Sequence, residues 1–212
     1  MVAQPATARL PATAAREHES EGAVMQLLET LYGAIDDDGA LAVVAETIAR
    51  ASGCRSGHIH HFTPGGATHF HQMSYFGAGH AELYVRHFVT RDVWLQTSQR
   101  EGLAGRVLNM DRFVPPEEFA KTELYNDLFR AHGDDTGRCM GVLTRMGPSL
   151  LVTAFHRPLT GAAFTPEEET ALGETLGHLR RVLQLRRLLA DERAHARCLA
   201  TMVEATEAAM LV

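Results

Sequence analysis

The first regular pattern of hydrophobic residues in the chain has the spacing of an α-helix. Apolar side chains recur three or four residues apart at Val24, Leu27, Leu28, Leu31, Tyr32 and Ile35. The acidic run 36–38 and Gly39 end this helix and cap a second one, whose apolar stripe is formed by Leu41, Val44, Ile48 and Ala51. The pattern therefore predicts two antiparallel helices joined by a short acidic turn.

Two segments with the pattern of β-strands follow, residues 55–63 and 68–76. The loop Pro64-Gly65-Gly66-Ala67 between them has the length of a hairpin connection. If Thr63 pairs with Thr68, His60 lies opposite His71. Because side chains alternate along a strand, one face of the sheet then carries His58, His60, His69 and His71.

The middle of the chain predicts a helix that crosses one face of this sheet. Helical spacing is seen at Leu83, Tyr84, His87 and Phe88, and an irregular continuation is expected through Val93, Trp94 and Leu95. Residues 102–110 predict a further strand, which ends before Pro115-Pro116.

The stretch from residue 122 to residue 189 predicts a helix, a hairpin and a long helix. The first helix has an apolar stripe, closed by Gly133 in the C′ position, that contains Leu124, Tyr125, Leu128, Phe129 and His132. Residues 139–145 and 150–156 are rich in β-forming residues, and Gly147-Pro148-Ser149 between them favours a turn.

The last helix has a strong start signal and an unusual length. Thr165 is placed as N-cap, Pro166 at the first helical position and Glu168 two residues later, which is a capping box. Residues 166–208 contain no further proline. A first apolar seam contains Leu172, Leu176, Leu179 and Leu183, and a second contains Val182, Leu185, Leu189, Ala196, Leu199 and Val203. We expect the first seam to pack on the sheet and the second on another subunit.

This order of elements predicts an α+β domain with a single antiparallel sheet flanked by helices and a long, coiled-coil-like C-terminal helix. The predicted organisation has three parts. Residues 1–20, rich in Ala, Thr and Pro, form a flexible tail; residues 21–164 form the domain; and residues 165–212 form a signalling and dimerisation helix.

Three sequence segments, in the order in which they occur along the chain, resemble a known group of proteins. KTELYNDLFRAHG, a strand pair ending in AFHRP, and FTPEEETALGETLGHLRRVLQL are similar to the N-terminal sensory region of bacterial LuxR-type transcriptional regulators, over residues 21–190. In that group a GAF- or PAS-like domain precedes a C-terminal helix-turn-helix. The resemblance implies a GAF/PAS-like regulatory domain without an active site, and a DNA-binding half outside these residues.

Composition and charge limit the kinds of partner that the chain can bind. The chain has 212 residues, 45% of them hydrophobic, enough for one sizeable core. A net charge of −6 argues against direct contact with nucleic acid, which basic surfaces bind. Three cysteines without a CxxC pair are compatible with a reducing cytoplasm. The sequence has no apolar run of the ~20 residues that span a bilayer, so no membrane partner is expected.

The sequence offers no candidate catalytic residue, metal site or cofactor motif. The patterns GxSxG, HExxH, GxxxxGK[ST] and GxGxxG are all missing, so we expect a protein that is not an enzyme. The alternative is a metal or haem protein, because the chain has 12 histidines and the face of the 58–71 hairpin could hold a transition metal. A third possibility is a module that only dimerises and binds no ligand.

The expected partners are an unknown small molecule and a second copy of the chain, joined through residues 172–203. A small-molecule site needs aromatic walls with a few polar groups. The candidate ligand-binding residues are therefore His60, His71, Tyr75, Phe88, Trp94, Tyr125, Phe129 and His156. Simple core packing is the competing interpretation of the aromatic residues. His156 and Arg157, in AFHRP, are also explained by closing a strand and bonding to loop carbonyls.

Overall fold

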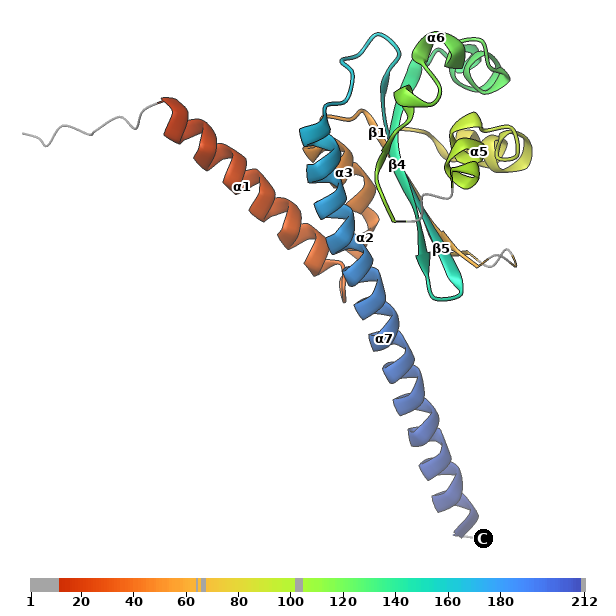
Figure 1. Cartoon of the computed structure of the whole chain (residues 1–212). Helices are drawn as coiled ribbons and strands as arrows, with labels where there is room; N and C mark the ends of the chain where they lie inside the picture. Colours follow the sequence, from red (N-terminus) through yellow and green to blue (C-terminus); the bar gives the residue numbers. More distant parts are fainter. Residues whose placement is uncertain (1–11, 64, 66–67, 102–104, 211–212) are drawn as a thin grey trace, which may run out of the picture.

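A computed structural model describes residues 12–63, 65, 68–101 and 105–210 of the chain. Its centre is one antiparallel sheet with the strand order β2-β1-β5-β4-β3 (Figure 1). The strands are β1 (Ser56–Phe62), β2 (Thr68–Met73), β3 (Leu108–Asn109), β4 (Thr136–Met146) and β5 (Ser149–Pro158). The single antiparallel sheet of the sequence-based prediction is thus confirmed.

The strand predicted over residues 102–110 is wrong in length. Only Leu108 and Asn109 pair with β4, and residues 102–104 lie outside the described part of the chain. The side chain of Asn109 accepts a hydrogen bond from the N–H of Asp111 and so begins the 3-10 turn η2 (Met110–Arg112). This cap ends the strand, because a capping side chain competes with the backbone ladder.

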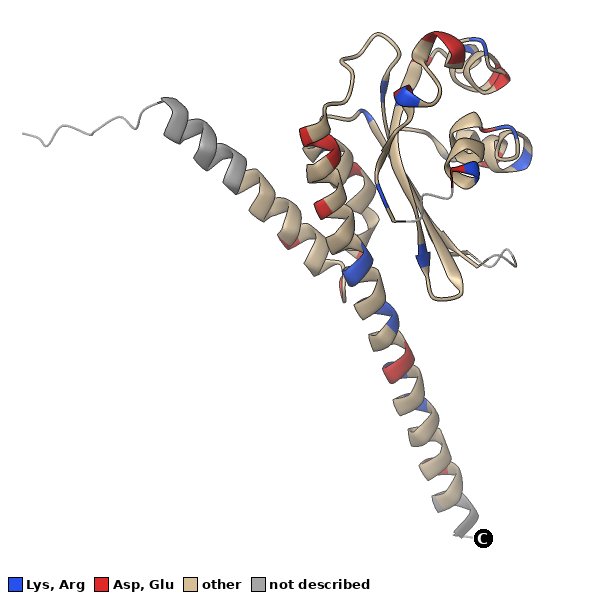
Figure 2. Cartoon of the chain, viewed as in Figure 1, with Lys and Arg blue, Asp and Glu red and all other residues tan. Residues whose placement is uncertain are grey.

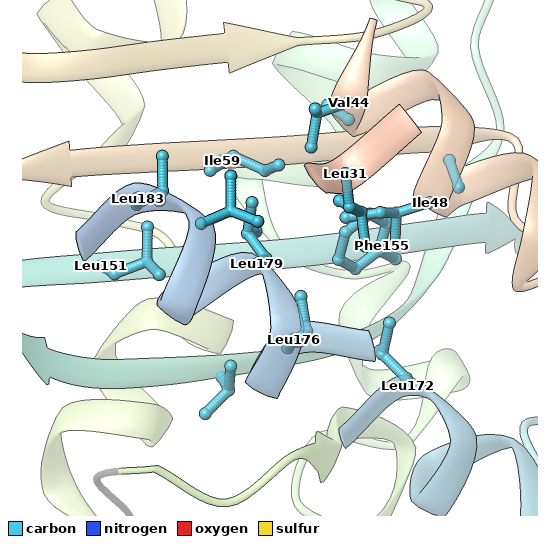
Figure 3. Close-up of a cluster of buried hydrophobic side chains, with 14 of the residues drawn as sticks. Leu31, Val44, Ile48, Ile59, Leu151, Phe155, Leu172, Leu176, Leu179 and Leu183 are labelled. Atoms are coloured by element: carbon cyan, nitrogen blue, oxygen red, sulfur yellow. The ribbon is translucent and has the colours of Figure 1, made fainter. Parts of the chain in front are cut away.

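One face of the sheet is covered by α1 (Ala12–Gly33), α2 (Asp38–Ala42), α3 (Val44–Ala51) and α7 (Pro166–Met210). Leu31 and Ile48 belong to the same core as Ile59, Leu151 and Phe155 of the sheet (Figure 3). The first predicted seam of α7 is confirmed, since its four leucines are buried there. Val182, expected to face another subunit, is instead fully buried in the same core. α1 begins at Ala12, so residues 12–20 are helical where a tail was predicted.

The predicted capping box at the start of α7 is present. The N–H of Thr165 donates to Oε2 of Glu168 at 2.9 Å, and the N–H of Glu168 donates to Oγ1 of Thr165 at 3.3 Å. Beyond Arg186, every described side chain of α7 up to residue 206 is exposed. The helix continues past the sheet as a free rod, and α1 diverges from it (Figure 1). Both basic and acidic residues occur along this rod (Figure 2).

Short helices cover the other face of the sheet. They are α4 (Ala78–Leu83), the π-helix η1 (Tyr84–Phe88), α5 (Val93–Arg100), α6 (Pro116–Phe119), the π-helix η3 (Leu124–Phe129) and the 3-10 turn η4 (Arg130–His132). Gly133 follows with a φ of 76°, as expected for its C′ position. The irregular segment predicted at residues 93–95 is the first turn of α5, because Asp92 caps it. No helix in the described residues has the length and hydropathy needed to cross a membrane.

Candidate ligand-binding site

A cavity of about 70 Å³ lies between the sheet and the short helices. Its sheet side includes His58, Gly141, Val152 and Ala154. Its helical side is mostly apolar and includes Trp94, Leu95, Met110, Leu124, Leu128 and Phe129. Sites for drug-sized ligands are larger, about 300–1,000 Å³, so such a ligand requires the covering side chains to move apart.

Asp92 and Tyr84 form a hydrogen-bonded polar pair in the lining of the cavity. The phenol of Tyr84 donates to Oδ2 of Asp92 at 2.7 Å. Oδ1 of Asp92 accepts the N–H groups of Trp94 and Leu95 at 2.8 and 3.1 Å, which is the N-cap of α5. Burial raises the pKa of Asp92, against the opposing effect of these three hydrogen bonds. Burial and the adjacent carboxylate also raise the pKa of Tyr84, so the phenol stays protonated.

His58 connects the cavity to a row of imidazoles on the hairpin. Its Nε2 atom lies 3.1 Å from Nε2 of His71, so one ring donates the hydrogen and the other accepts it. Burial, reinforced by His71, lowers the pKa of His58. Burial also lowers the pKa of His60 to about 4, and its ring centroid lies 4.9 Å from that of His71. At neutral pH the row is uncharged.

His156, on β5, also lines the cavity. Its ring stacks on Trp94 with centroids 5.6 Å apart, and its Nδ1 lies 3.0 Å from Oγ of Ser56. Burial lowers the pKa of His156 to about 4. Trp94 in turn stacks on Phe119, with centroids 3.8 Å apart and planes 8° from parallel. This stack fixes the position of the Trp94 ring at the cavity wall.

Next to β2, Phe76 lines the cavity and Tyr75 lies outside its lining. Among the described residues, Tyr75 is the one non-glycine residue with a positive φ, 77°. The guanidinium of Arg55 lies 4.9 Å from its ring centroid and also donates to Asp134 at 3.0 Å and Asp135 at 2.6 Å. A left-handed conformation costs a non-glycine residue roughly 1–2 kcal/mol. The Arg55 contacts help to hold this turn, which directs Phe76 into the cavity lining.

Three of the predicted ligand-binding residues line the cavity: Trp94, Phe129 and His156. The other five, which are outside its lining, are His60, His71, Tyr75, Phe88 and Tyr125. Phe88 and Tyr125 pack in the surrounding core, and Tyr75 is 57% exposed beneath Arg55. His60 and His71 lie opposite each other as predicted, but they reach the cavity only through His58.

His69 does not share the face of His60 and His71, so this prediction is wrong. The pairing register shifts between His61 and Phe62, where Phe62 pairs with Thr68. The ring of His69 therefore lies against that of His61, with centroids 4.9 Å apart. His61 is on the side of the sheet that faces α7, because side chains alternate along β1.

Sequence reasoning missed Asp92, Tyr84 and His58 as ligand-site residues. An aspartate directly before an apolar helical segment is an N-cap signal, and this signal would have identified both α5 and the cap at Asp92. The metal alternative finds no support in the geometry. In the part of the chain that the structure describes, no group of three or more His, Cys, Asp or Glu side chains could hold a metal ion.

Solved structures of bacterial regulators share this fold. The VqsR LBD domain from Pseudomonas aeruginosa matches with a TM-score of 0.50 and 18% identity, over 81% of this chain and 96% of that chain. Escherichia coli SdiA matches with a TM-score of 0.56 and 15% identity, over 81% and 69%. The N-acylhomoserine lactone dependent LuxR family transcription factor CepR2 from Burkholderia cenocepacia matches with a TM-score of 0.50 and 14% identity, over 76% and 92%.

The sequence matches no protein-family model and no curated protein. The structural likeness, at these low identities, concerns the fold. It confirms that the chain has the architecture of the sensory domains of LuxR-type regulators, as the sequence resemblance implied.

Proposed function

We propose that this chain is the sensory domain of a LuxR-type transcriptional regulator, and that it binds a small molecule in the cavity beside Asp92. The observation that carries the proposal is the hydrogen-bonded pair of Asp92 and Tyr84 in a mostly apolar cavity. Such a cavity with few polar groups is the usual form of a small-molecule site. The proposed domain acts in the cytoplasm and is not an enzyme.

The charges of the cavity favour an uncharged ligand. No Lys or Arg is among the described residues that line it, and its one carboxylate is engaged by three hydrogen bonds. The pKa values of His58 and His156 are lowered by burial, so both rings are neutral at pH 7. A buried anion would have no charged partner here, and unpaired buried charge is costly. The proposed ligand is therefore mostly apolar, with one or two hydrogen-bonding groups.

The exposed half of α7 supports a role in dimerisation and relay. Leu185, Leu189, Leu199 and Val203 are all exposed on it. A single helix in water is only marginally stable, so this apolar stripe is proposed to pack on a second copy within residues 172–203. Relay requires that the ligand binds one arrangement of the dimer more tightly than the other. Contact with DNA is assigned to parts of the regulator other than these residues.

Calorimetry with N-acylhomoserine lactones of short, medium and long acyl chain tests the proposal first, since CepR2 is dependent on this class. We expect saturable binding and a rise in melting temperature, because a ligand at 100 times its Kd stabilises the native state by about 2.7 kcal/mol. Neutral amphiphiles of other classes follow in the same assay. A chain that binds none of them would contradict the proposal.

A matched pair of variants locates the ligand. Trp94→Leu changes an aromatic wall of the cavity, whereas Tyr125→Leu changes an aromatic residue of the same core that does not line it. We expect Trp94→Leu to weaken binding at least tenfold and Tyr125→Leu to leave the Kd within about threefold, since a tenfold change corresponds to about 1.4 kcal/mol of lost contact. Equal effects of the two variants would place the ligand elsewhere.

A further inference from the structure

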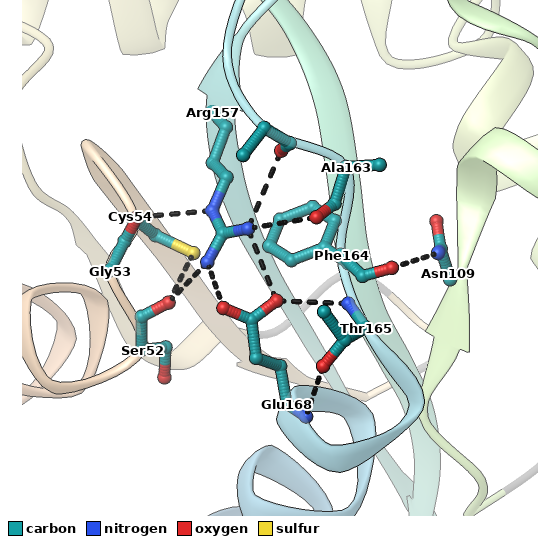
Figure 4. A network of polar contacts seen from close by, with 10 residues as sticks. Ser52, Gly53, Cys54, Asn109, Arg157, Ala163, Phe164, Thr165 and Glu168 are labelled. Carbon is teal, nitrogen blue, oxygen red and sulfur yellow. Dashed lines mark hydrogen bonds and ion pairs between the residues drawn. The ribbon is translucent and has the colours of Figure 1, made fainter.

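Arg157 joins the end of α3 to the rest of the fold. Its side chain is buried, and Nε donates to the carbonyl of Gly53 at 3.0 Å while Nη2 donates to that of Ser52 at 3.0 Å (Figure 4). These carbonyls follow the last turn of α3, where a cation is favourable because the helix dipole is negative there. The predicted bonding of Arg157 to loop carbonyls is thus confirmed.

The same guanidinium also binds Glu168 in the first turn of α7. Nη2 lies 2.7 Å from Oε1 of Glu168, and Nη1 lies 3.2 Å from Oε2 (Figure 4). Oε2 is the atom that accepts the N–H of Thr165 in the capping box. The face of the guanidinium lies 4.2 Å from the ring centroid of Phe164. A bidentate pair of this kind fixes both distance and orientation, so the first turn of α7 is tied rigidly to β5.

Arg157 is also the immediate neighbour of a cavity residue. Side chains alternate along β5, so His156 points into the cavity beside Trp94 and Arg157 points to the opposite face, where α7 lies. A displacement of the β5 backbone at His156 therefore moves Arg157, and through it Glu168. His156, which lines the cavity, and Arg157, which binds the first turn of α7, are therefore joined by a single peptide bond.

We infer that the Arg157–Glu168 pair is the junction through which the state of the cavity sets the direction of α7. Arg157 is a positioning residue in this scheme and does not contact the ligand. The inference rests on the proposed sensory function, because it concerns the relay from that same cavity. Cys198 lies about 33 Å along the helix from Leu176, so a tilt of about 5° about Leu176 displaces Cys198 by about 3 Å.

The chain offers a natural position from which to measure this displacement. Cys198 is exposed on α7, whereas Cys54 and Cys139 are buried and poorly reactive because burial raises both thiol pKa values. A second label is placed on the sheet by Arg145→Cys, an exposed position of β4. Spin labels at these two sites report the distance between the sheet and the far part of α7 within one copy, after dilution into unlabelled protein.

The cavity is filled from within, so that no ligand needs to be known. Ala154→Val adds two methyl groups to the floor next to His156 and suits a strand. The substitution is made in two separate backgrounds. One is Glu168→Gln, whose amide oxygen can still accept a hydrogen bond from the N–H of Thr165, and the other is Arg157→Lys. The matched control is Glu169→Gln, which removes the charge of the neighbouring carboxylate of α7, about 100° further around the helix, where it pairs with Arg112.

We expect Ala154→Val to shift the label distance by about 3 Å in the natural background and with Glu169→Gln, at the lever length given above. We expect no shift with Glu168→Gln or Arg157→Lys. Melting curves establish that each variant is folded, and if Arg157→Lys does not fold, Glu168→Gln decides alone. A merely structural role would lower the melting temperature in these variants but leave the shift intact.

Two results would overturn the junction. The first is an undiminished shift with Glu168→Gln, and the second is a helix that does not move in any background when the cavity is filled. The proposed sensory function fails separately, if calorimetry finds no ligand for the natural chain. A chain that binds a lactone but does not move α7 would therefore refute only the junction.

Discussion

The buried imidazole of His156 links the cavity to pH. Burial lowers its pKa to about 4, whereas an unfolded chain has a histidine pKa of about 6.5. Between about pH 4 and pH 6.5, the unfolded state therefore binds a proton at this residue and the folded state does not. The stabilising effect of the neutral ring is fully present above about pH 6.5 and is lost as the pH falls toward 4.

We predict that the natural chain loses about 1.4 kcal/mol of stability between pH 7.5 and pH 5.5 through His156 alone. Urea denaturation at the two pH values measures this loss. His156→Gln keeps a hydrogen-bonding side chain but does not titrate, so its pH-dependent loss should be smaller by about that amount. An identical pH dependence of the two proteins would exclude His156 as the titrating group.

Arg55 shows at the same scale why some contacts escape a sequence-based prediction. It pairs with Asp134 and Asp135, about 80 positions later in the chain, and packs on the ring of Tyr75. In the sequence, the two aspartates lie between the helix closed by Gly133 and the strand predicted over residues 139–145. Only the pairing of strands far apart in the chain brings a cation to them, and no local pattern contains that information.

At the scale of elements, α7 changes character along its length. Leu179 is fully buried against the sheet, whereas Leu188, about two and a half turns further on, is 60% exposed. The helix was predictable because its capping box and its leucine spacing are both local signals. The partner of each seam was less predictable. Val182 has the spacing of the second seam, yet it is buried because α1 and the sheet together surround this part of α7.

The two leucines provide a direct comparison. We predict that Leu179→Ala lowers the free energy of unfolding by about 2–5 kcal/mol, because it leaves a cavity in the core. Leu188→Ala should change it by less than about 0.5 kcal/mol in the monomer, since the side chain is already exposed. Chemical denaturation at low protein concentration measures both. Similar losses would mean that Leu188 is covered by the same chain.

The elements around the cavity were harder to predict than the core elements. Two of the helices there are π-helices, η1 and η3, whose spacing departs from the regular period used to read amphipathic helices. The strand pairs were correct, but a bulge at His61 and Phe62 reversed the side on which His69 lies. Trp94, Phe129 and His156 were among the candidates because a small-molecule site needs aromatic walls with a few polar groups.

At the scale of the whole molecule, two long helices leave the domain with apolar side chains exposed. Val24 and Met25 on α1, and Leu199, Met202 and Val203 on α7, are all more than half exposed. Exposed apolar stripes of this length mark interaction sites in soluble proteins. They support the proposed homodimer, in which the helices of two copies would cover one another.

We predict that Leu199→Glu shifts the chain from dimer toward monomer, because it places a charge in the proposed seam. Thr201→Glu is the matched control, since it adds the same charge about 200° around the helix from Leu199. Sedimentation equilibrium should show at least a tenfold weaker dimer for Leu199→Glu and a nearly unchanged one for Thr201→Glu. If both variants dimerise as tightly as the natural chain, the interface lies away from this stripe.

Asp92 gives the molecule an internal reporter. One of its oxygens starts α5 and the other holds the phenol of Tyr84, so the first turn of that helix depends on the same carboxylate that a guest molecule would approach. Any guest that draws on this carboxylate changes how firmly the amide hydrogens of Trp94 and Leu95 are held. The rate at which those two hydrogens exchange with solvent therefore reports whether the cavity is occupied, without any added label.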